Sequence, residues 1–552
     1  MRDLKVKFSE GSNIEIKYGT DIQTILEKTG QLEKSSYPAA AALVNNELVS
    51  LNSRLKINAE VVPVFLDSNS GARVYRKTLT AVLSKVCSDL FPDRRLMVGH
   101  SLDTGYFCYF DGGLSVSAED LKIIRSSILK VIKDNLKITY EYLSYEEACS
   151  FFESNTSKNL ILKYRNEPII PVYRIGEWVD IAYEPLLPAT GILHHFDLLN
   201  YEPGFILRYP HAASPDRLEK FEDNSILKSI YTEYKAWGKI LNIDCAGKLN
   251  RLTGDKEIKD FIRVAESLHE KKLSIIADHI AEKRENLRVV LIAGPSSSGK
   301  TTFTKKLAIH LKVLGFNPQL ISLDDYYVQR DQTPKDENGD YNFEALEAID
   351  IVQLNSDLLQ LFDGQEVEIP SYNFKTGFRE YKGHKIKMES RNILLIEGIH
   401  GLNDRLTEKI PAQQKFKIYI SALTQLNLDD NNRIATTDNR LIRRMVRDHQ
   451  FRGYSALKTL GMWASVKRGE KKNIFPFQNN ADAVFNSALD YELAVLKNLA
   501  VPVLKTVKPW HEEYAEASRL MSFLNNLITI QTTNVPMNSI LREFIGDSDF
   551  KY

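Results

Sequence analysis

Cysteine is scarce in this chain of 552 residues, which has only four copies of it. They are Cys87, Cys108, Cys149 and Cys245, and no two of them form a C-x-x-C pair. This spacing argues against a disulfide framework or a zinc knuckle and fits a reducing compartment. We therefore expect a cytoplasmic protein.

An excess of one charge is also missing, because 72 Lys and Arg residues match 72 Asp and Glu residues. A balanced chain offers no global argument for binding nucleic acid or a membrane surface. The N-terminus lacks the apolar core of a signal peptide, and no apolar run approaches the roughly 18 residues that a membrane span needs. We expect no membrane contact.

The chain is too long for one hydrophobic core, and its length predicts roughly three or four domains. Residues 1–66 have the alternating pattern of a small β-grasp domain, and residues 67–215 have the mixed pattern of an α+β domain. Residues 216–284 form a charged, mostly helical connector to residues 285–510, where strands and helices alternate. Residues 511–552 have helical periodicity and predict an extension without chemistry of its own.

Four largely apolar runs lie within the alternating region, at residues 289–293, 319–323, 393–396 and 416–420. Such runs are typical of strands that are buried on both faces of a sheet. Helical segments separate them, which predicts a doubly wound parallel sheet. The expected fold class is therefore α/β, with a β-grasp domain and an α+β domain in front.

A phosphate-binding loop follows the first of these strands. Residues 294–301 fit the pattern GxxxxGK[ST] and open a helical segment, which is the context that this motif requires. Its backbone N–H groups and the helix N-terminus favour phosphate oxygens, Lys300 would reach the β- and γ-phosphates, and Thr301 would bind Mg²⁺. The expected ATP contacts in and beside the loop are Gly294, Ser296, Ser297, Ser298, Gly299, Lys300, Thr301 and Thr302.

Two acidic residues follow later strands of the same predicted sheet. Asp324 ends the second run and Glu397 ends the third, and ligands of open α/β sheets bind beside the carboxyl ends of the strands. Asp324 is our candidate for the base that takes a proton from an attacking hydroxyl. We expect Thr301, Asp324 and Glu397 to hold Mg²⁺ together.

A run of arginines forms one face of a later helical segment. Arg440, Arg443, Arg444 and Arg447 have the spacing i, i+3, i+4 and i+7, and no glutamate interleaves with them. A solvated charged face is one interpretation. The other is a lid that contacts phosphates, because arginines stabilise the charge of a phosphoryl group in transfer. We assign Arg440 and Arg444 to ATP, and Arg443 and Arg447 to the transfer itself.

Together these motifs resemble the uridine kinase and phosphoribulokinase family over about residues 285–500. The resemblance implies ATP-dependent phosphorylation of the 5′-hydroxyl of a nucleoside, with uridine and cytidine as the foremost candidates. It also implies that Asp324 is the base.

The same resemblance implies an acceptor site. The ribose-binding aspartate of the family falls on Glu344, and its base-contacting segment falls on residues 370–379, where Tyr372 and Arg379 match. The histidine of that segment falls at Gly377, so the choice of nucleobase stays open. The implied acceptor-binding set is Asp324, Tyr327, Glu344, Tyr372, Arg379 and Arg447.

The front half has resemblances of its own. Residues 1–65 resemble a TGS domain, and residues 70–210 resemble the second, editing-type domain of threonyl-tRNA synthetase, on the segments 99–107 and 176–181. The four positions of the editing site are here Lys77, Ala81, Ala182 and Leu186. None of these side chains can act as a metal ligand or editing nucleophile at neutral pH. We expect a degenerate editing site, and we expect His100, His194 and His195 to be structural or surface residues.

Two alternatives stay open. The acceptor is a different small hydroxyl metabolite, such as a sugar phosphate or a pantothenate-like alcohol, or the protein is an RNA-binding regulator that uses ATP as a switch. RNA contact through the front domains and a homo-oligomeric state are both compatible with the sequence.

Overall fold

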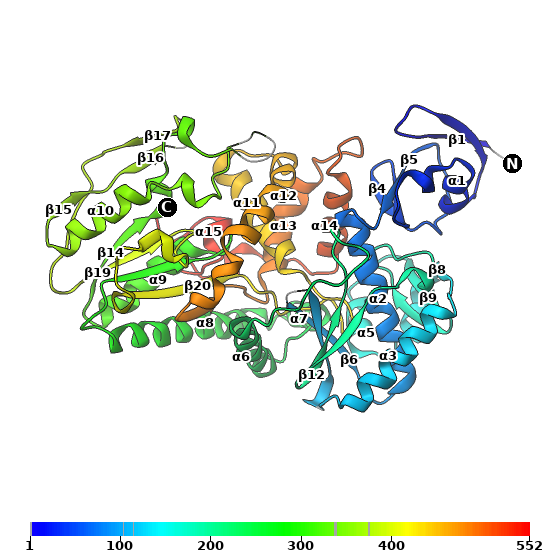
Figure 1. Cartoon of the computed structure of the whole chain (residues 1–552). Coiled ribbons are helices and arrows are strands. Elements are labelled where there is room, and N and C mark those ends of the chain that lie inside the picture. The colour runs from blue at the N-terminus through cyan, green and yellow to red at the C-terminus, as the bar shows by residue number, and fades with distance from the viewer. Residues whose placement is uncertain are drawn as a thin grey trace.

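The structure is a computed structural model that describes residues 3–551 except 103, 114, 336–338, 340, 374 and 375. Figure 1 shows two halves, with the N-terminal domains at one end of the molecule and, at the other, the parallel sheet of the region that resembles a kinase. We call this sheet the kinase sheet and the half that contains it the kinase half. None of the described helices is long and apolar enough to cross a bilayer.

The β-grasp domain is a five-stranded sheet in the order β2-β1-β5-β3-β4. Leu4 and Val6 are buried while the lysines beside them are exposed. The alternating sequence pattern thus follows the pleat of the strand, in which successive side chains point to opposite faces of the sheet. Strand β4 has three residues and was not predicted, because so short a segment has no readable period. The elements are β1 (Asp3–Lys7), β2 (Asn13–Lys17), α1 (Ile22–Lys28), β3 (Ala39–Val44), β4 (Glu47–Val49) and β5 (Ala59–Phe65).

The second domain combines two antiparallel sheets, β10-β9-β8 and β11-β12-β7-β6, with four helices. Helix α2 begins where Ser68 accepts a hydrogen bond from the Gly71 amide at 3.0 Å. The strands are β6 (Leu96–Leu102), β7 (Gly105–Phe110), β8 (Ile138–Ser144), β9 (Ile169–Ile175), β10 (Trp178–Ile181), β11 (Asp197–Tyr201) and β12 (Gly204–Arg208). The helices are α2 (Asn69–Leu90), α3 (Ala118–Lys133), α4 (Tyr145–Phe151) and α5 (Thr156–Leu162).

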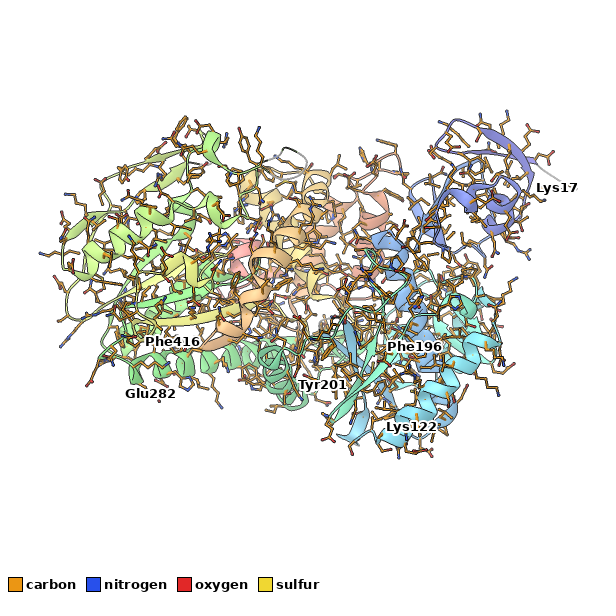
Figure 2. All side chains as sticks on the ribbon, in the orientation of Figure 1. Lys17, Lys122, Phe196, Tyr201, Glu282 and Phe416 are labelled. Carbon is orange, nitrogen blue, oxygen red and sulfur yellow. The ribbon has the colours of Figure 1, made fainter. Side chains whose placement is uncertain are left out.

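Three helices follow: α6 (Ser225–Leu241), α7 (Ala246–Gly254) and α8 (Ile258–Glu282). Helix α8 runs along the kinase sheet in Figure 1, and its buried face shares one hydrophobic cluster with the strands. In Figure 2, Glu282 at the end of this helix lies near Phe416 of the sheet, and the Lys283 ammonium lies 4.9 Å from the centroid of the Phe416 ring. Helix α8, the last helix of the connector, thus covers part of one face of the sheet.

The kinase sheet has five parallel strands in the order β14-β19-β13-β20-β21, which confirms the doubly wound fold. Val290 and Ile292 pack towards α8 and α9, and Val289 and Leu291 pack towards α10, so apolar residues line both faces. The strands are β13 (Val289–Ala293), β14 (Asn317–Ser322), β19 (Asn392–Glu397), β20 (Lys415–Ser421) and β21 (Ala483–Asn486). The helices are α9 (Lys300–Val313), α10 (Ile351–Phe362), α11 (Thr436–Arg452), α12 (Ala456–Asn473) and α13 (Glu492–Leu504).

Two small ribbons lie outside the kinase sheet. They pair β15 (Glu366–Glu368) with β18 (Lys385–Lys387) and β16 (Ser371–Asn373) with β17 (Phe378–Glu380). The C-terminal segment forms α14 (Tyr514–Asn525) against α13 and then α15 (Arg542–Ile545) against α11. The C-terminus therefore returns to the kinase half, as Figure 1 shows.

The segment between β20 and α11 fastens the two halves together. The Val98 amide donates to the Asp430 carbonyl at 2.8 Å, and the Asn427 side chain donates to the Val98 carbonyl at 2.9 Å. Arg95 donates twice to the Asp430 carboxylate, at 2.8 and 3.1 Å. The segment that leads into α11 is thus held by the α+β domain.

Candidate active site

The phosphate loop joins β13 to α9 in the form that the sequence predicted. A Cβ atom at Gly294 would lie 2.0 Å from the Ile420 carbonyl oxygen, so no other residue fits beside β20. Ser297 and Gly299 have φ values of 59° and 82°, in the left-handed region that turns the loop around on itself. These two residues therefore let the chain turn back between β13 and α9.

Lys300 lies across the loop that it belongs to. Its ammonium donates to the carbonyl oxygens of Gly294 at 3.0 Å and Pro295 at 3.3 Å. A positive charge is thereby held over the loop, where the terminal phosphates of a nucleotide would lie.

Thr301 and Glu397 meet at the end of β19. The Thr301 hydroxyl donates to Glu397 Oε1 at 2.7 Å. Burial raises the pKa of Glu397 to about 7, although Lys300 and the Thr301 hydroxyl act in the opposite direction. A hydroxyl and a carboxyl oxygen are ligands that suit Mg²⁺, and bringing a cation here would favour the ionised carboxylate. These residues fit the metal that the loop motif implies.

Asp324 lies in the turn η4 (Leu323–Tyr326), directly after β14. Its side chain reaches water at the mouth of the site, but the surrounding protein removes enough hydration to raise its pKa. Lys300, Arg452 and Arg447 and a hydrogen bond with Tyr327 lower that pKa in part. The structure thus places Asp324 in the electrostatic reach of the loop lysine.

Aromatic side chains line the side of the site away from the loop. The Tyr327 ring meets the rings of Phe343 and Tyr372 edge-on, each at 5.6 Å between centroids. The Tyr327 hydroxyl donates to the Phe343 carbonyl at 3.1 Å, and the Tyr372 amide donates to Asp325 at 3.2 Å. These contacts form an apolar wall that begins beside Asp324.

Glu344 lies against α12, where Gly469 leaves it room: a Cβ atom at that glycine would lie 2.5 Å from the Glu344 Cβ. Burial and, to a smaller extent, Glu470 raise the pKa of Glu344 to about 7, while Arg444 and Lys300 oppose them. Its Oε2 atom is buried and has no hydrogen-bond partner among the described residues. Glu344 is therefore placed to accept a hydrogen bond from a ligand hydroxyl.

Arg379 pairs with Asp350, Nη2 to Oδ2, at 2.8 Å. Near it, Arg330 fills the space that a side chain at position 377 would need, because a Cβ atom at Gly377 would lie 2.8 Å from the Arg330 Cβ and 2.9 Å from its Nε. A hydrogen bond from Arg330 also lowers the pKa of Tyr372, although burial raises that pKa overall. Sequence reasoning missed Arg330, because it precedes the matched segment by some forty residues.

Arg440 and Arg443 of α11 are almost fully buried and pair with glutamates of other helices. Arg440 donates to Glu470 at 2.5 and 2.8 Å and to the Ser296 carbonyl at 3.2 Å. Arg443 donates to Glu492 at 3.1 Å through Nε, and contacts the loop from the same side. No glutamate interleaves with the arginines in the segment itself, but α12 and α13 supply acidic partners to Arg440 and Arg443. Their assignment to phosphate and transfer stays a prediction.

The other two arginines lie nearer the open side of the loop. Arg444 donates to the Ser296 hydroxyl at 2.8 Å and pairs with Asp448 at 3.3 Å. Arg447 pairs with the same aspartate at 2.8 Å, and its charge reaches Asp324. The helix therefore supports the loop with one pair of arginines and borders the site with the other.

Two further carboxylates contact the loop, and neither was predicted. Glu470 accepts a hydrogen bond from the Ser296 amide at 3.1 Å. Glu543 of α15 accepts from the Thr302 amide at 3.1 Å and from its hydroxyl at 2.7 Å. No local pattern marks these residues, because they come from helices far along the chain.

The positions that were matched to an editing site lie partly beside residues of the kinase half. Lys77 pairs with Glu184 at 3.5 Å, and Ala182 packs against the core of its own domain. Three of the four editing positions line one small cavity, with kinase residues on the other side. That lining includes Lys77, Ala81, Leu186, Asn431 and Asn432.

The histidines of this domain lie apart from that cavity lining. The His100 ring stacks on Tyr231 at 3.3 Å between centroids, and His194 and His195 are 6.4 Å apart. Over the described ranges, no three His, Cys, Asp or Glu side chains gather as a metal site would need.

The class of the C-terminal half follows from its loop, its parallel sheet and its sequence. Residues 289–494 match the model of the phosphoribulokinase / uridine kinase family, which supports a P-loop kinase domain in this part of the chain. A structure described as a possible uridine kinase from Bacillus stearothermophilus is 17% identical and covers 38% of this chain and 97% of its own, with a TM-score of 0.26.

The curated relatives match the chain elsewhere, through the N-terminal region of threonine–tRNA ligases. The ligase of Syntrophomonas wolfei is 28% identical over 193 residues, which are 34% of this chain and 30% of the ligase. Threonine–tRNA ligase 2 of Bacillus subtilis is 34% identical over 179 residues, which are 32% of this chain and 28% of the ligase. The chain thus spans less than a third of the length of these relatives.

Proposed function

We propose that this protein transfers the γ-phosphate of ATP to the 5′-hydroxyl of a nucleoside, with uridine and cytidine as the foremost acceptors. One observation carries the proposal. The phosphate loop, the Thr301–Glu397 pair and Asp324 lie at one edge of the parallel sheet, and aromatic residues continue the site from there. A phosphoryl donor and a hydroxyl acceptor need these two neighbouring compartments.

The donor side would work by position and charge. The loop amides and Lys300 bind the phosphates, and Thr301, Glu397 and Asp324 would hold Mg²⁺. The metal supplies neutralisation of the charge that develops on the phosphoryl oxygens. Arg447 adds positive charge at the open side of the site.

The acceptor side would orient the hydroxyl towards Asp324. Its carboxylate accepts the proton as the oxygen attacks phosphorus, and Glu344 binds the remaining sugar hydroxyls. Tyr327, Tyr372 and Arg379 bound the space for the base. Holding both reactants in line supplies much of the rate, because little covalent help is needed.

The test is ADP release from the purified protein with Mg²⁺ and ATP. Uridine, cytidine, adenosine, guanosine and inosine are compared with no acceptor, and Lys300→Met serves as the inactive control. Strong stimulation by one or two nucleosides supports the proposal. No stimulation by any of them, with ATP still bound, contradicts it.

A kinase of another small hydroxyl metabolite is the second candidate, and Arg330 is the observation that favours it. Arg330 brings a guanidinium to the place where the family has a histidine, and guanidinium donors also suit carboxylates and phosphates. A sugar phosphate in the same assay, stimulating ADP release where nucleosides do not, would select this candidate.

A further inference from the structure

The carboxylate of Glu543, in the C-terminal segment, contacts the first turn of α9, the helix that follows the phosphate loop. Glu543 Oε2 accepts hydrogen bonds from both the amide and the hydroxyl of Thr302, at 3.1 and 2.7 Å. Thr302 is fully buried, so these donors face Glu543 and not solvent. They belong to the turn whose N–H groups cradle nucleotide phosphates in loops of this type.

The segment around Glu543 also covers the loop itself. Ile540 lies against Gly299, where a Cβ atom would be only 2.6 Å from the Ile540 Cγ2. The Phe544 ring lies 4.9 Å from the Arg443 guanidinium, and the Asn538 carbonyl accepts from the Lys306 ammonium at 2.8 Å. The carboxylate is thus held on the loop by a packed segment and not by one flexible side chain.

A carboxylate and a phosphate compete for such donors. Both are anions that a helix N-terminus stabilises, and one amide hydrogen serves one of them well at a time. A triphosphate that entered with Glu543 in place would also meet its negative charge at close range.

We propose that residues 536–549 form an autoinhibitory segment, and that Glu543 leaves Thr302 when nucleotide phosphates bind. The inference rests on nucleotide binding by this loop and not on the identity of the acceptor. By linkage, whatever stabilises the segment on the loop weakens nucleotide binding by the same factor.

The first experiment compares Mg²⁺–ATP binding by calorimetry in the full chain and in Glu543→Gln. Glutamine keeps the shape and one acceptor oxygen but loses the charge, so the Kd should fall by on the order of tenfold. The matched control is Asp549→Asn, which removes an exposed charge from the same segment and should leave the Kd within about twofold. An unchanged or higher Kd in Glu543→Gln would show that Glu543 is only a helix cap, and would overturn the proposal.

The second experiment needs no variant. Hydrogen exchange of the unaltered chain is followed with and without Mg²⁺–ATP, and peptides from residues 536–549 should exchange faster when nucleotide is bound. Equal or slower exchange in that segment overturns the proposal. Neither experiment contains an acceptor. A negative result in the nucleoside assay therefore does not affect the interpretation of either experiment.

Discussion

Among single residues, the neighbours Asp324 and Asp325 differ in their surroundings. Asp325 is engaged by the Tyr372 amide at 3.2 Å and so supports the acceptor wall. Asp324 instead lies near the loop lysine and Arg447, at the open side of the site. Of the two, Asp324 is therefore the candidate base.

Asp324→Asn should therefore lower kcat by about 10²–10⁴, because the amide cannot accept the acceptor proton. ATP affinity, measured by calorimetry, should change little. Asp325→Asn is the control, since an amide oxygen still accepts from Tyr372, and it should keep most of the turnover. Turnover near that of the unaltered protein in Asp324→Asn would remove this residue as the base.

Glu344 predicts a pH dependence. Its pKa of about 7 lies above the ordinary 4.5, so the folded protein keeps this proton where the unfolded chain has lost it. Between these values the folded state binds more protons, and the stability that Glu344 contributes falls as the pH rises. Binding of acceptor hydroxyls needs the ionised form, so kcat/KM for the acceptor should rise through about pH 7 to a plateau. Glu344→Gln should abolish this limb in a pH series, and an unchanged limb would assign it to another group.

At the scale of residues, the sequence predicted the site residues that belong to continuous local motifs. The residues of the loop, together with the acids that end β14 and β19, follow from local motifs and from the rule that strand ends meet. Arg330, Glu470 and Glu543 could not be predicted, because each reaches the site by tertiary packing that no local pattern records.

Among the elements, α11 shows what the periodicity of a sequence can and cannot predict. Its apolar residues Leu441, Ile442, Met445 and Val446 are buried. Its arginine side was interpreted as a solvated face or a lid that contacts phosphates, because no glutamate interleaves with the arginines in the segment itself. For Arg440 and Arg443 the acidic partners are Glu470 on α12 and Glu492 on α13, and spacing within one helix cannot report the charges on its neighbours. Arg444 and Arg447 pair with Asp448 of α11 itself.

The Arg440–Glu470 pair predicts a stability change. Arg440→Met should lower the free energy of unfolding by about 3–5 kcal/mol, because it leaves the buried Glu470 without its partner. Combining it with Glu470→Met should restore much of that loss, since two apolar side chains can fill the space. Denaturant midpoints check both variants. A single variant as stable as the unaltered protein would mean that water reaches Glu470.

For the whole molecule, the unexpected feature is the attachment of α11 to the α+β domain. Hydrophobic patterns predicted the segments of each domain. Such a pattern indicates that a residue is buried, but it does not indicate which other part of the molecule covers that residue. The connection from β20 to α11 is held by backbone and side-chain bonds to residues 95–98 of the front half. The front half is therefore attached to the segment that leads into α11.

This attachment predicts that a change far from the loop alters catalysis. Asp430→Ala removes the paired hydrogen bonds from Arg95, at 2.8 and 3.1 Å, and leaves the connection to α11 less restrained. Because α11 holds the phosphate loop through Arg440 and Arg443, kcat/KM for ATP should fall by roughly tenfold, as small displacements in an active site do. Asp111→Ala is the control: it removes the other, exposed partner of the same arginine, 3.7 Å away, and should have little effect. If steady-state kinetics of Asp430→Ala match those of this control, the front half is attached to the kinase site without supporting it.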